Sequence, residues 1–424
     1  MKSRLLQVMA IAGLILPLTV YADGNTVVVE QEGIGNVATI IQQDATNSHA
    51  GIYQIGDQHQ ASINQAGMTD AYDEIRQSGI GNELRIEMEI QNLSAEQVGE
   101  GNVGHLMGEA ENVSFRQEGN NNSAYINVRG FGYPADLAIT QMGNENLISL
   151  GCPEPYDICI DDPLISQSLA DDLFYTQIGD SNEIHARLDL SNYQEITQLG
   201  DDNYFYTRVT DGYMNILLVN QVGTGNQADS YIGWGENQQL ILTQDGLGNA
   251  ASTWQHADRN QLEVLQQGNL NLADIVQRQD NTGMVEQTGD NNQADLRMWM
   301  GESLVLLQDG ANHYAEYDSD PNSGPTNSAA DISQSGNSHS AIVYDFGNSD
   351  STLLLLQDGT GHNMLVNQSA RHSDMAAQQD GSGNEFSVIQ SGIQMSADIM
   401  QSGNFNVVHL TQEGVGNTVD ITQQ

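Results

Sequence analysis

The sequence predicts an all-β fold: a β-solenoid of stacked strand–arc–strand repeats with amyloid-like packing. Two observations support this. The pattern Gln-x-Gly-x-x-Asn returns along almost the whole chain, and from Gln357 to Gln423 a glutamine stands at every eleventh position. Elsewhere the interval is usually near 22 residues. Self-similarity at a fixed period of about 20 to 50 residues is typical of a stacked repeat array rather than a globular enzyme.

Each repeat is predicted to be a strand, a tight arc and a second strand. In the copy from Gln31 to Gln42, the residues after Asn36 follow the period of two that indicates a strand. Gly33 and Gly35 precede Asn36, and glycine accepts positive φ, so the chain can reverse there without a steric penalty. The arc glycines of the clearest copies are Gly33, Gly35, Gly223, Gly225, Gly246, Gly248, Gly381, Gly383, Gly414 and Gly416.

The face that carries the alternate apolar residues also carries the flanking Gln and Asn side chains. A buried amide needs hydrogen-bond partners. If identical turns stack, each amide can bond to the same residue above and below, about 4.8 Å away. The residues predicted to form this stacking ladder are Gln31, Asn36, Gln42, Gln54, Gln77, Asn82, Gln221, Asn226, Gln244, Asn249, Gln357, Gln368, Gln379, Asn384, Gln390, Gln401, Asn406, Gln412, Asn417 and Gln423.

One solenoid is expected to span residues 23–424. At about 22 residues per turn this gives roughly 18 turns, and at about 4.8 Å per turn a stack on the order of 85 Å long. Two segments interrupt the pattern: residues 150–163 contain three prolines, and residues 318–327 contain Pro321 and Pro325. Because proline cannot donate a hydrogen bond within a central strand, both segments are predicted to be loops extruded from the solenoid.

Residues 1–22 have the pattern of a secretory signal peptide. Lys2 and Arg4 precede an apolar run from Leu5 to Val20, and residues 20–22 offer a small-residue cleavage site. The run is short for a membrane span and nothing like it recurs, so no transmembrane segment is expected. The chain is therefore predicted to be exported.

The composition is strongly acidic. The chain has 12 Lys and Arg against 56 Asp and Glu, a net charge of −44, which becomes −46 when Lys2 and Arg4 leave with the signal. This charge argues against nucleic acid as a partner. The carboxylates either form a solvated surface that keeps the chain soluble before assembly, or bind divalent cations where they stack. No known calcium-loop motif is present, so a cation site would be diffuse.

Two residue types remain open to more than one interpretation. Cys152 and Cys159 are the only cysteines. In an exported protein they favour a disulfide that closes the first loop, with free or intermolecular thiols as the alternative. Histidine takes the place of the arc asparagine in four copies. It either replaces the asparagine hydrogen bonds or forms a metal-binding or pH-sensing column. These histidines are His59, His313, His339 and His362.

No motif for catalysis stands out. The chain lacks Gly-x-Ser-x-Gly, His-Glu-x-x-His and a phosphate-binding loop. Polysaccharide lyases also use parallel β-helices, but their coils are longer and less uniform than these repeats. We therefore predict no catalytic, cofactor or metal site and do not expect an enzyme.

The repeat resembles the curlin repeat of curli, the bacterial extracellular amyloid fibres. That family's pattern is Ser-x5-Gln-x-Gly-x-Gly-Asn-x-Ala-x3-Gln. The segment from Gln31 to Gln42 follows it from the first Gln onward, and Gln221 to Ala228 follows it closely. The resemblance covers about residues 23–424 and makes this chain a long, acidic variant. It implies a secreted structural subunit that passes through the periplasm and an outer-membrane secretion pore. With a nucleator, it would polymerise into cell-surface fibres, or fimbriae, of the biofilm matrix.

The competing hypothesis is a monomeric, acidic β-solenoid that acts as an adhesin or as a surface- or cation-binding module. Capping separates the two, because a soluble solenoid normally covers its open ends. The first repeat starts close to the predicted cleavage site, and the last turn, from Asn417 to Gln423, is as regular as any other. Both ends are expected to be open, which favours self-association into fibres.

Overall fold

The computed structural model describes residues 5–12, 18–22, 24–67, 69–87, 90–106, 110–125, 137–149, 173–186, 192–208, 215–233, 235–319, 327–345 and 350–424. The chain divides into two compact units, Met1–Leu217 and Leu218–Gln424. Every regular element in the described residues is a β-strand, so the predicted all-β class is confirmed. Within these residues, no helix has the length and apolar character needed to cross a bilayer.

In unit 1 the chain alternates between two parallel sheets, sheet A and sheet B. Sheet B contains β3 (Asn25–Glu32), β5 (His49–Asp57), β7 (Tyr72–Ile80), β10 (Leu93–Glu100), β13 (Val113–Asn120), β15 (Leu137–Met142), β17 (Leu173–Ile178) and β19 (Asn192–Leu199). Sheet A contains β4 (Asn36–Gln43), β6 (Gln60–Ala66), β8 (Glu83–Glu87), β11 (Val103–Gly104), β14 (Ser123–Ala124), β16 (Leu147–Ile148), β18 (Glu183–Ile184) and β20 (Tyr204–Thr207). A separate short parallel pair is formed by β9 (Ile90–Gln91) and β12 (Ala110–Glu111).

Unit 2 repeats the same architecture. Its sheet B contains β23 (Gln239–Leu247), β25 (Gln261–Asn269), β27 (Thr282–Asp290), β29 (Ser303–Ala311), β31 (Ala329–Asn337), β33 (Thr352–Thr360), β35 (Asp374–Ser382), β37 (Ser396–Asn404) and β39 (Thr418–Gln423). Its sheet A contains β22 (Gln227–Ile232), β24 (Ala250–Gln255), β26 (Leu272–Gln277), β28 (Gln293–Arg297), β30 (Tyr314–Ser319), β32 (Ser340–Asp345), β34 (Asn363–Arg371), β36 (Glu385–Ile393) and β38 (Val407–Val415). The remaining strand, β21 (Asn215–Thr224), contains the boundary between the units.

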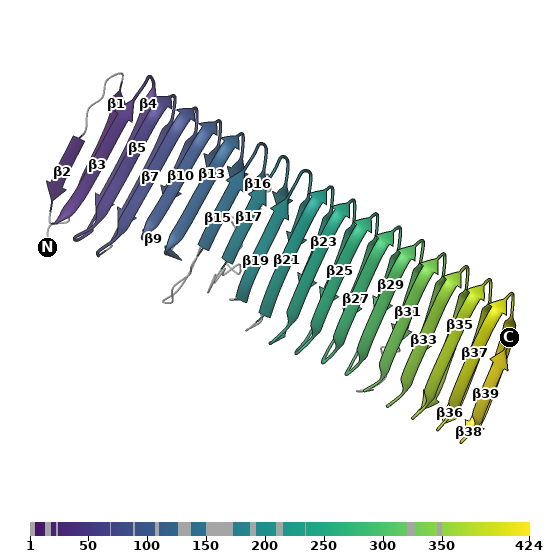
Figure 1. Cartoon of the computed structure of the whole chain (residues 1–424). Coiled ribbons are helices and arrows are strands. Elements are labelled where there is room, and N and C mark those ends of the chain that lie inside the picture. Colours follow the sequence, from purple (N-terminus) through teal and green to yellow (C-terminus); the bar gives the residue numbers. More distant parts are fainter. Residues whose placement is uncertain are drawn as a thin grey trace, which may run out of the picture. The chain divides into compact units, whose positions relative to one another are not determined.

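Within each unit, the strands of sheets A and B named above pair in parallel with the strand one turn later, and Figure 1 shows the strands of sheet B in unit 2 side by side in chain order. The pairs β3/β4 to β19/β20 make eight turns among the described residues of unit 1, and β23/β24 to β37/β38 make eight in unit 2. The predicted β-solenoid is therefore confirmed in each unit. That the whole of 23–424 is one continuous solenoid stays a prediction.

The register survives the interruptions of the pattern. Gln141 pairs with Gln177 although 36 residues separate them, and Gln308 pairs with Gln334 across 26 residues. The predicted loops fall within these two intervals, and nearly all of their residues lie outside the described ones. Cys152 also lies outside them, as does Cys159, so the disulfide stays a prediction.

Two further strands are antiparallel to the rest. The strand β1 (Leu5–Ala12) pairs with β4, and β2 (Leu18–Ala22) pairs with β3. Both lie within the residues predicted to be a signal peptide, and that assignment stays a prediction. While residues 5–12 and 18–22 are present, they occupy the sheet edges of the first turn.

The core lies between the sheets and is filled by alternate residues of most strands. In β25, Leu262, Val264 and Gln266 are buried, whereas the residues between them face outward. Large side chains are matched by small neighbours. The core position of β11 is Gly104, where a Cβ atom would lie 2.8 Å from Cζ of the buried Phe115. Because the core is closely packed, a large side chain in one strand requires a small residue beside it, so the turns cannot all carry the same residue at one position.

A core position of β7 holds a carboxylate. Asp73 of β7 is 1% exposed, and its partners in the adjacent turns are Ala50 and Leu93. The Gln65 amide donates to Asp73 Oδ2 at 2.6 Å, and the backbone N–H of Leu93 donates to Oδ1 at 3.1 Å. Burial raises the pKa of Asp73 to about 6, because the surroundings solvate the charged form poorly and the two hydrogen bonds compensate only in part.

We predict that Asp73→Asn stabilises the protein at pH 7 by about 1 to 2 kcal/mol, because a neutral side chain avoids burying charge but loses the bond from Gln65. The raised pKa means that folded Asp73 keeps a proton which the unfolded chain releases. The wild type therefore loses stability as the pH rises from about 4 through about 6, and the advantage of the variant should shrink toward pH 4. Denaturant unfolding of freshly purified protein at pH 4, 5.5 and 7 measures this difference. A difference that is constant with pH would contradict it.

Candidate functional site: stacked arcs and amide ladders

The main feature of both units is a column of buried glutamines at the ends of the sheet B strands. In each step the side-chain Nε2 donates to Oε1 of the glutamine one turn later, at 2.6–3.1 Å. Within unit 1 the bonded column is Gln31, Gln54, Gln77, Gln97, Gln117, Gln141, Gln177 and Gln198. Within unit 2 it is Gln221, Gln244, Gln266, Gln287, Gln308, Gln334, Gln357, Gln379, Gln401 and Gln423.

The second hydrogen of most of these amides bonds across the core to sheet A. Gln54 Nε2 donates to the Val37 carbonyl at 3.1 Å, and Gln266 Nε2 donates to the Ala250 carbonyl at 3.0 Å. Most of these glutamines thus connect neighbouring turns and also the two sheets. Because both donors and the acceptor are used, the cost of burying the amide is offset.

A second glutamine column lies in sheet A and consists of short runs. Gln42 donates to Gln65 at 2.7 Å, Gln255 to Gln277 at 3.1 Å, and Gln390 to Gln412 at 2.7 Å. Gln368 occupies the same column, one turn before Gln390. The glutamines at eleven-residue spacing therefore alternate between the sheets. One complete turn contains two arcs. The interval between equivalent glutamines is therefore near 22 residues, and the interval of eleven residues appears only where both arcs keep the glutamine.

The arc asparagines bond chiefly to the backbone. Asn226 Nδ2 donates to the Val222 carbonyl at 3.0 Å and to the Gly246 carbonyl of the next turn at 3.1 Å, while its Oδ1 accepts from the backbone N–H of Asn249 at 3.1 Å. Asn36, Asn82 and Asn384 hold their arcs in the same way, and Asn406 and Asn417 cap the arcs of the last turns. In one stretch of unit 1 the arc asparagines also bond directly to one another; its members are Asn82, Asn102, Asn122, Asn146, Asn182 and Asn203.

The two glycines of each arc have different roles. At Gly223 φ is +113°, and an added Cβ would lie 2.0 Å from the carbonyl oxygen of Gly246 in the next turn. At Gly225 φ is +68° and no atom lies within 4 Å of an added Cβ. Other turns place ordinary residues at this second position, including Leu270 at φ +57°. The first glycine is therefore required by the close stacking of arcs, whereas the second only eases a left-handed backbone.

Histidine replaces the arc asparagine without changing the bonding pattern. Asn82 donates its backbone N–H to His59 Nδ1 at 3.3 Å, and His59 Nε2 lies 3.2 Å from the Ile55 carbonyl. His313, His339 and His362 make the corresponding contacts in three successive turns. In all four rings Nδ1 accepts a backbone hydrogen, so its lone pair is already in use.

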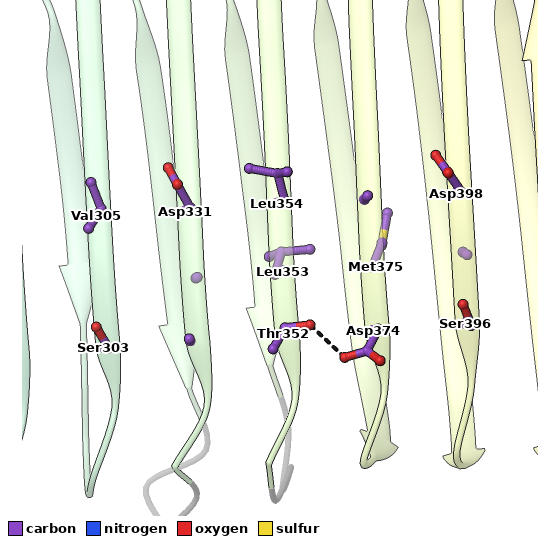
Figure 2. A pocket seen from close by; sticks show the side chains of 14 residues that line it. Ser303, Val305, Asp331, Thr352, Leu353, Leu354, Asp374, Met375, Ser396 and Asp398 are labelled. Atoms are coloured by element: carbon purple, nitrogen blue, oxygen red, sulfur yellow. Dashed lines mark hydrogen bonds between the residues drawn. The ribbon is translucent and has the colours of Figure 1, made fainter.

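The outward faces carry many carboxylates, together with exposed apolar side chains such as Ile55 and Leu247. A shallow groove of about 500 Å³ crosses the outer face of sheet B in unit 2, and Figure 2 shows Asp331, Leu354 and Asp398 along it. Thr352 Oγ1 donates to Asp374 Oδ1 there at 2.6 Å. The lining offers hydroxyl, carboxylate and aliphatic groups. Among the described residues, no group of three or more His, Cys, Asp or Glu is placed to hold a metal ion.

The predicted ladder residues therefore belong to three sets: the long glutamine column, the short one and the arc asparagines. Several members of the long column, such as Gln266, Gln308 and Gln334, were not in the predicted set. Their Gln-x-Gly signal is present in the sequence, but their arcs lack the second glycine. The carboxylate of Asp73 gave no signal at all, because nothing in its local pattern distinguishes an inward from an outward aspartate.

We predict opposite outcomes for two alanine substitutions in one arc. Gly223→Ala should destabilise unit 2 by at least about 2–3 kcal/mol, because the new Cβ clashes with the next arc in a backbone region that only glycine adopts readily. Gly225→Ala is the matched control and should cost about 1 kcal/mol, the strain of a left-handed alanine. Thermal and denaturant unfolding of both variants measures the costs, and equal costs would contradict the assignment of roles.

Comparison with known proteins agrees with this geometry. No curated protein matches the chain. Residues 396–424, which contain β37 to β39 with their arcs, match the family model of the curlin associated repeat. This part of the chain is therefore similar to the curlin associated repeat.

Proposed function

We propose that this protein is a secreted structural subunit of curli-like extracellular amyloid fibres that serve the biofilm matrix and adhesion. The observation that carries the proposal is the parallel, in-register stacking of near-identical turns, each joined to the next by a buried amide. Stacked strands with Asn and Gln ladders are the architecture of cross-β assemblies. The curlin associated repeat at residues 396–424 supports the same conclusion.

The proposed activity is self-association rather than catalysis. A turn of the solenoid offers a second copy the backbone and amide pattern that it offers its own next turn, and unpaired strand edges readily accept further strands. We also propose that residues 1–22 are removed as a signal peptide during export through the periplasm. Partners of the mature chain would be an outer-membrane secretion pore and a curli-type nucleator.

One observation favours the alternative of a monomeric, acidic adhesin. The antiparallel strands β1 and β2 occupy the sheet edges of the first turn, as a cap does in soluble solenoids. If these strands remain on the mature protein, that edge is blocked for a second copy. The fate of residues 1–22 and the tendency to assemble therefore distinguish the two functions.

We predict that purified protein lacking residues 1–22 forms fibres after a lag. Fibre diffraction should show reflections at about 4.7–4.8 Å and about 10 Å, the spacings of strands and of packed sheets. Protein that retains residues 1–22 should assemble more slowly. A stable, monodisperse monomer after prolonged incubation at high concentration would instead support the adhesin.

A matched pair of variants tests whether arc stacking drives assembly. At Gly359 an added Cβ would lie 2.0 Å from the Gly381 carbonyl, whereas no atom lies within 4 Å of one at Gly361. Gly359→Ala should lengthen the lag several-fold, and Gly361→Ala should leave it close to that of wild type. Equal lags would show that assembly does not depend on this stacking.

We predict that sodium chloride shortens the lag, because a charge near −46 on the mature chain opposes docking until salt screens it. Calcium at matched ionic strength should act more strongly where carboxylates stack. Asp274, Asp295 and Glu316 occupy one outward column in three successive turns, and the pKa of Asp295 is raised by burial and by these two neighbours, against the effect of Arg297. Loss of the extra calcium effect in Asp295→Asn would show that the effect depends on this column, while an equal effect of both salts would exclude bridging.

A further inference from the structure

Three successive turns of unit 2 carry a stack of histidine rings. His313, His339 and His362 are at most 1% exposed. The first two ring centroids are 5.0 Å apart with an angle of 9° between the planes, and the next two are 4.9 Å apart with an angle of 4°. We call these three residues the histidine column. It begins after Asn292 and is followed by Asn384, so it replaces three asparagines within a longer series of arcs.

The hydrogen bonds of the column fix the protonation state of every ring. The backbone N–H groups of His339, His362 and Asn384 donate to Nδ1 of the preceding ring at 3.3, 3.2 and 3.1 Å. Each Nε2 faces a backbone carbonyl, at 3.2, 2.8 and 2.9 Å, of Asp309, Ser335 and Asp358 respectively. Because a backbone N–H can only donate and a carbonyl can only accept, each ring must be neutral with its proton on Nε2.

A second proton has no place in this arrangement. On Nδ1 it would point at a backbone N–H, so one hydrogen bond per ring would become a contact between two donors. Two charged rings about 5 Å apart would also repel each other in a poorly solvated site. Asparagine makes the corresponding bonds in the adjacent arcs, but its side chain does not titrate at the pH values at which histidine does.

We propose that the histidine column is an acid-sensitive lock, which holds the three arcs that connect β29 to β30, β31 to β32 and β33 to β34 while neutral and releases them on protonation. The arcs closed by asparagine stay shut under the same conditions. Within unit 2, the device therefore opens the three arcs of the column and not those closed by asparagine. This inference does not rest on the proposed fibre function.

The carboxylates around the column favour protonation of the rings, but burial, which disfavours it, has the larger effect on their pKa. Asp309 and Asp358, on the column's own arcs, favour protonated rings, and the neighbouring arcs carry Asp290 and Asp380. Burial lowers the pKa of His339 to about 4, helped by the adjacent rings, and also lowers that of His313. At mildly acidic pH the unfolded chain therefore binds protons at these two histidines that the folded column does not bind. Stability is retained above about pH 6.5 and falls as the pH drops toward 4.

Hydrogen exchange of the full chain tests the lock. In wild type, after correction for intrinsic rates, exchange in peptides that cover 309–316, 335–342 and 358–366 should rise on the order of 100-fold between pH 7 and pH 4. This factor is the change in the opening equilibrium expected when a single ring, like that of His339, has its pKa lowered from 6.5 to about 4 in the folded chain. Arcs closed by Asn249 and Asn271 should show no such rise. The rise should disappear in His313→Asn/His339→Asn/His362→Asn, which restores the residue of the neighbouring turns, and persist in His409→Asn, which removes an exposed histidine outside the column.

Equal pH dependence in wild type and the triple variant would overturn the proposal, as would opening of all arcs together. A second measurement does not depend on the folding of the triple variant. Isotope-edited spectra of histidine in the wild-type protein should show His339 as the neutral Nε2–H tautomer from pH 7 to below pH 5. Titration of His339 near pH 6.5 in the folded protein would also overturn the proposal.

Discussion

The structure depends on the need of a buried amide for partners that water cannot supply. A glutamine placed between two sheets must find a donor and an acceptor within the protein, and the residue best placed is the same glutamine one turn away. That requirement imposes parallel strands, identical register and a turn height equal to one strand spacing. The solenoid keeps its register across intervals as different as 20 and 36 residues, because the glutamine positions are held while the length between them varies.

The glycine arcs follow from the same requirement. If the glutamines stack at strand spacing, so do the arcs that follow them, and consecutive arcs approach until only hydrogen fits at the first glycine. The second glycine is not under this constraint, which explains why residues as different as Leu270 and Asn291 replace it.

On the acidic outer faces, the stacking of turns has an unfavourable effect. Stacking brings Asp274 and Asp295 together without any compensating bond between them. Neutralisation of these carboxylates at low pH should therefore favour close stacking, whereas protonation of the histidine column, elsewhere in unit 2, opposes it.

Much of this architecture was predictable from the repeat. The period, the all-β class and the inward position of the amides follow from the regular copies such as Gln31 to Gln42. The sequence did not reveal that alternate glutamines of the eleven-residue series belong to different sheets, because each half-turn looks like a complete repeat. It also did not show that asparagines bond mainly to the backbone, since that depends on where the next arc's carbonyls lie. The burial of Asp73 could not be predicted, because it depends on the register of the strand, which the local sequence pattern does not specify.

The glutamine column also has an orientation. Every step within each unit runs from Nε2 of one turn to Oε1 of the next, and the first members of three runs, Gln31, Gln42 and Gln255, have an Oε1 atom without a partner among the described residues. The amide dipoles of a run therefore add instead of cancelling. Rotating a single amide would set two donors against each other on one side and two acceptors on the other, so a run can reverse only as a whole. The column behaves as a chain of aligned dipoles whose two ends are chemically different, and a stack assembled from it distinguishes up from down.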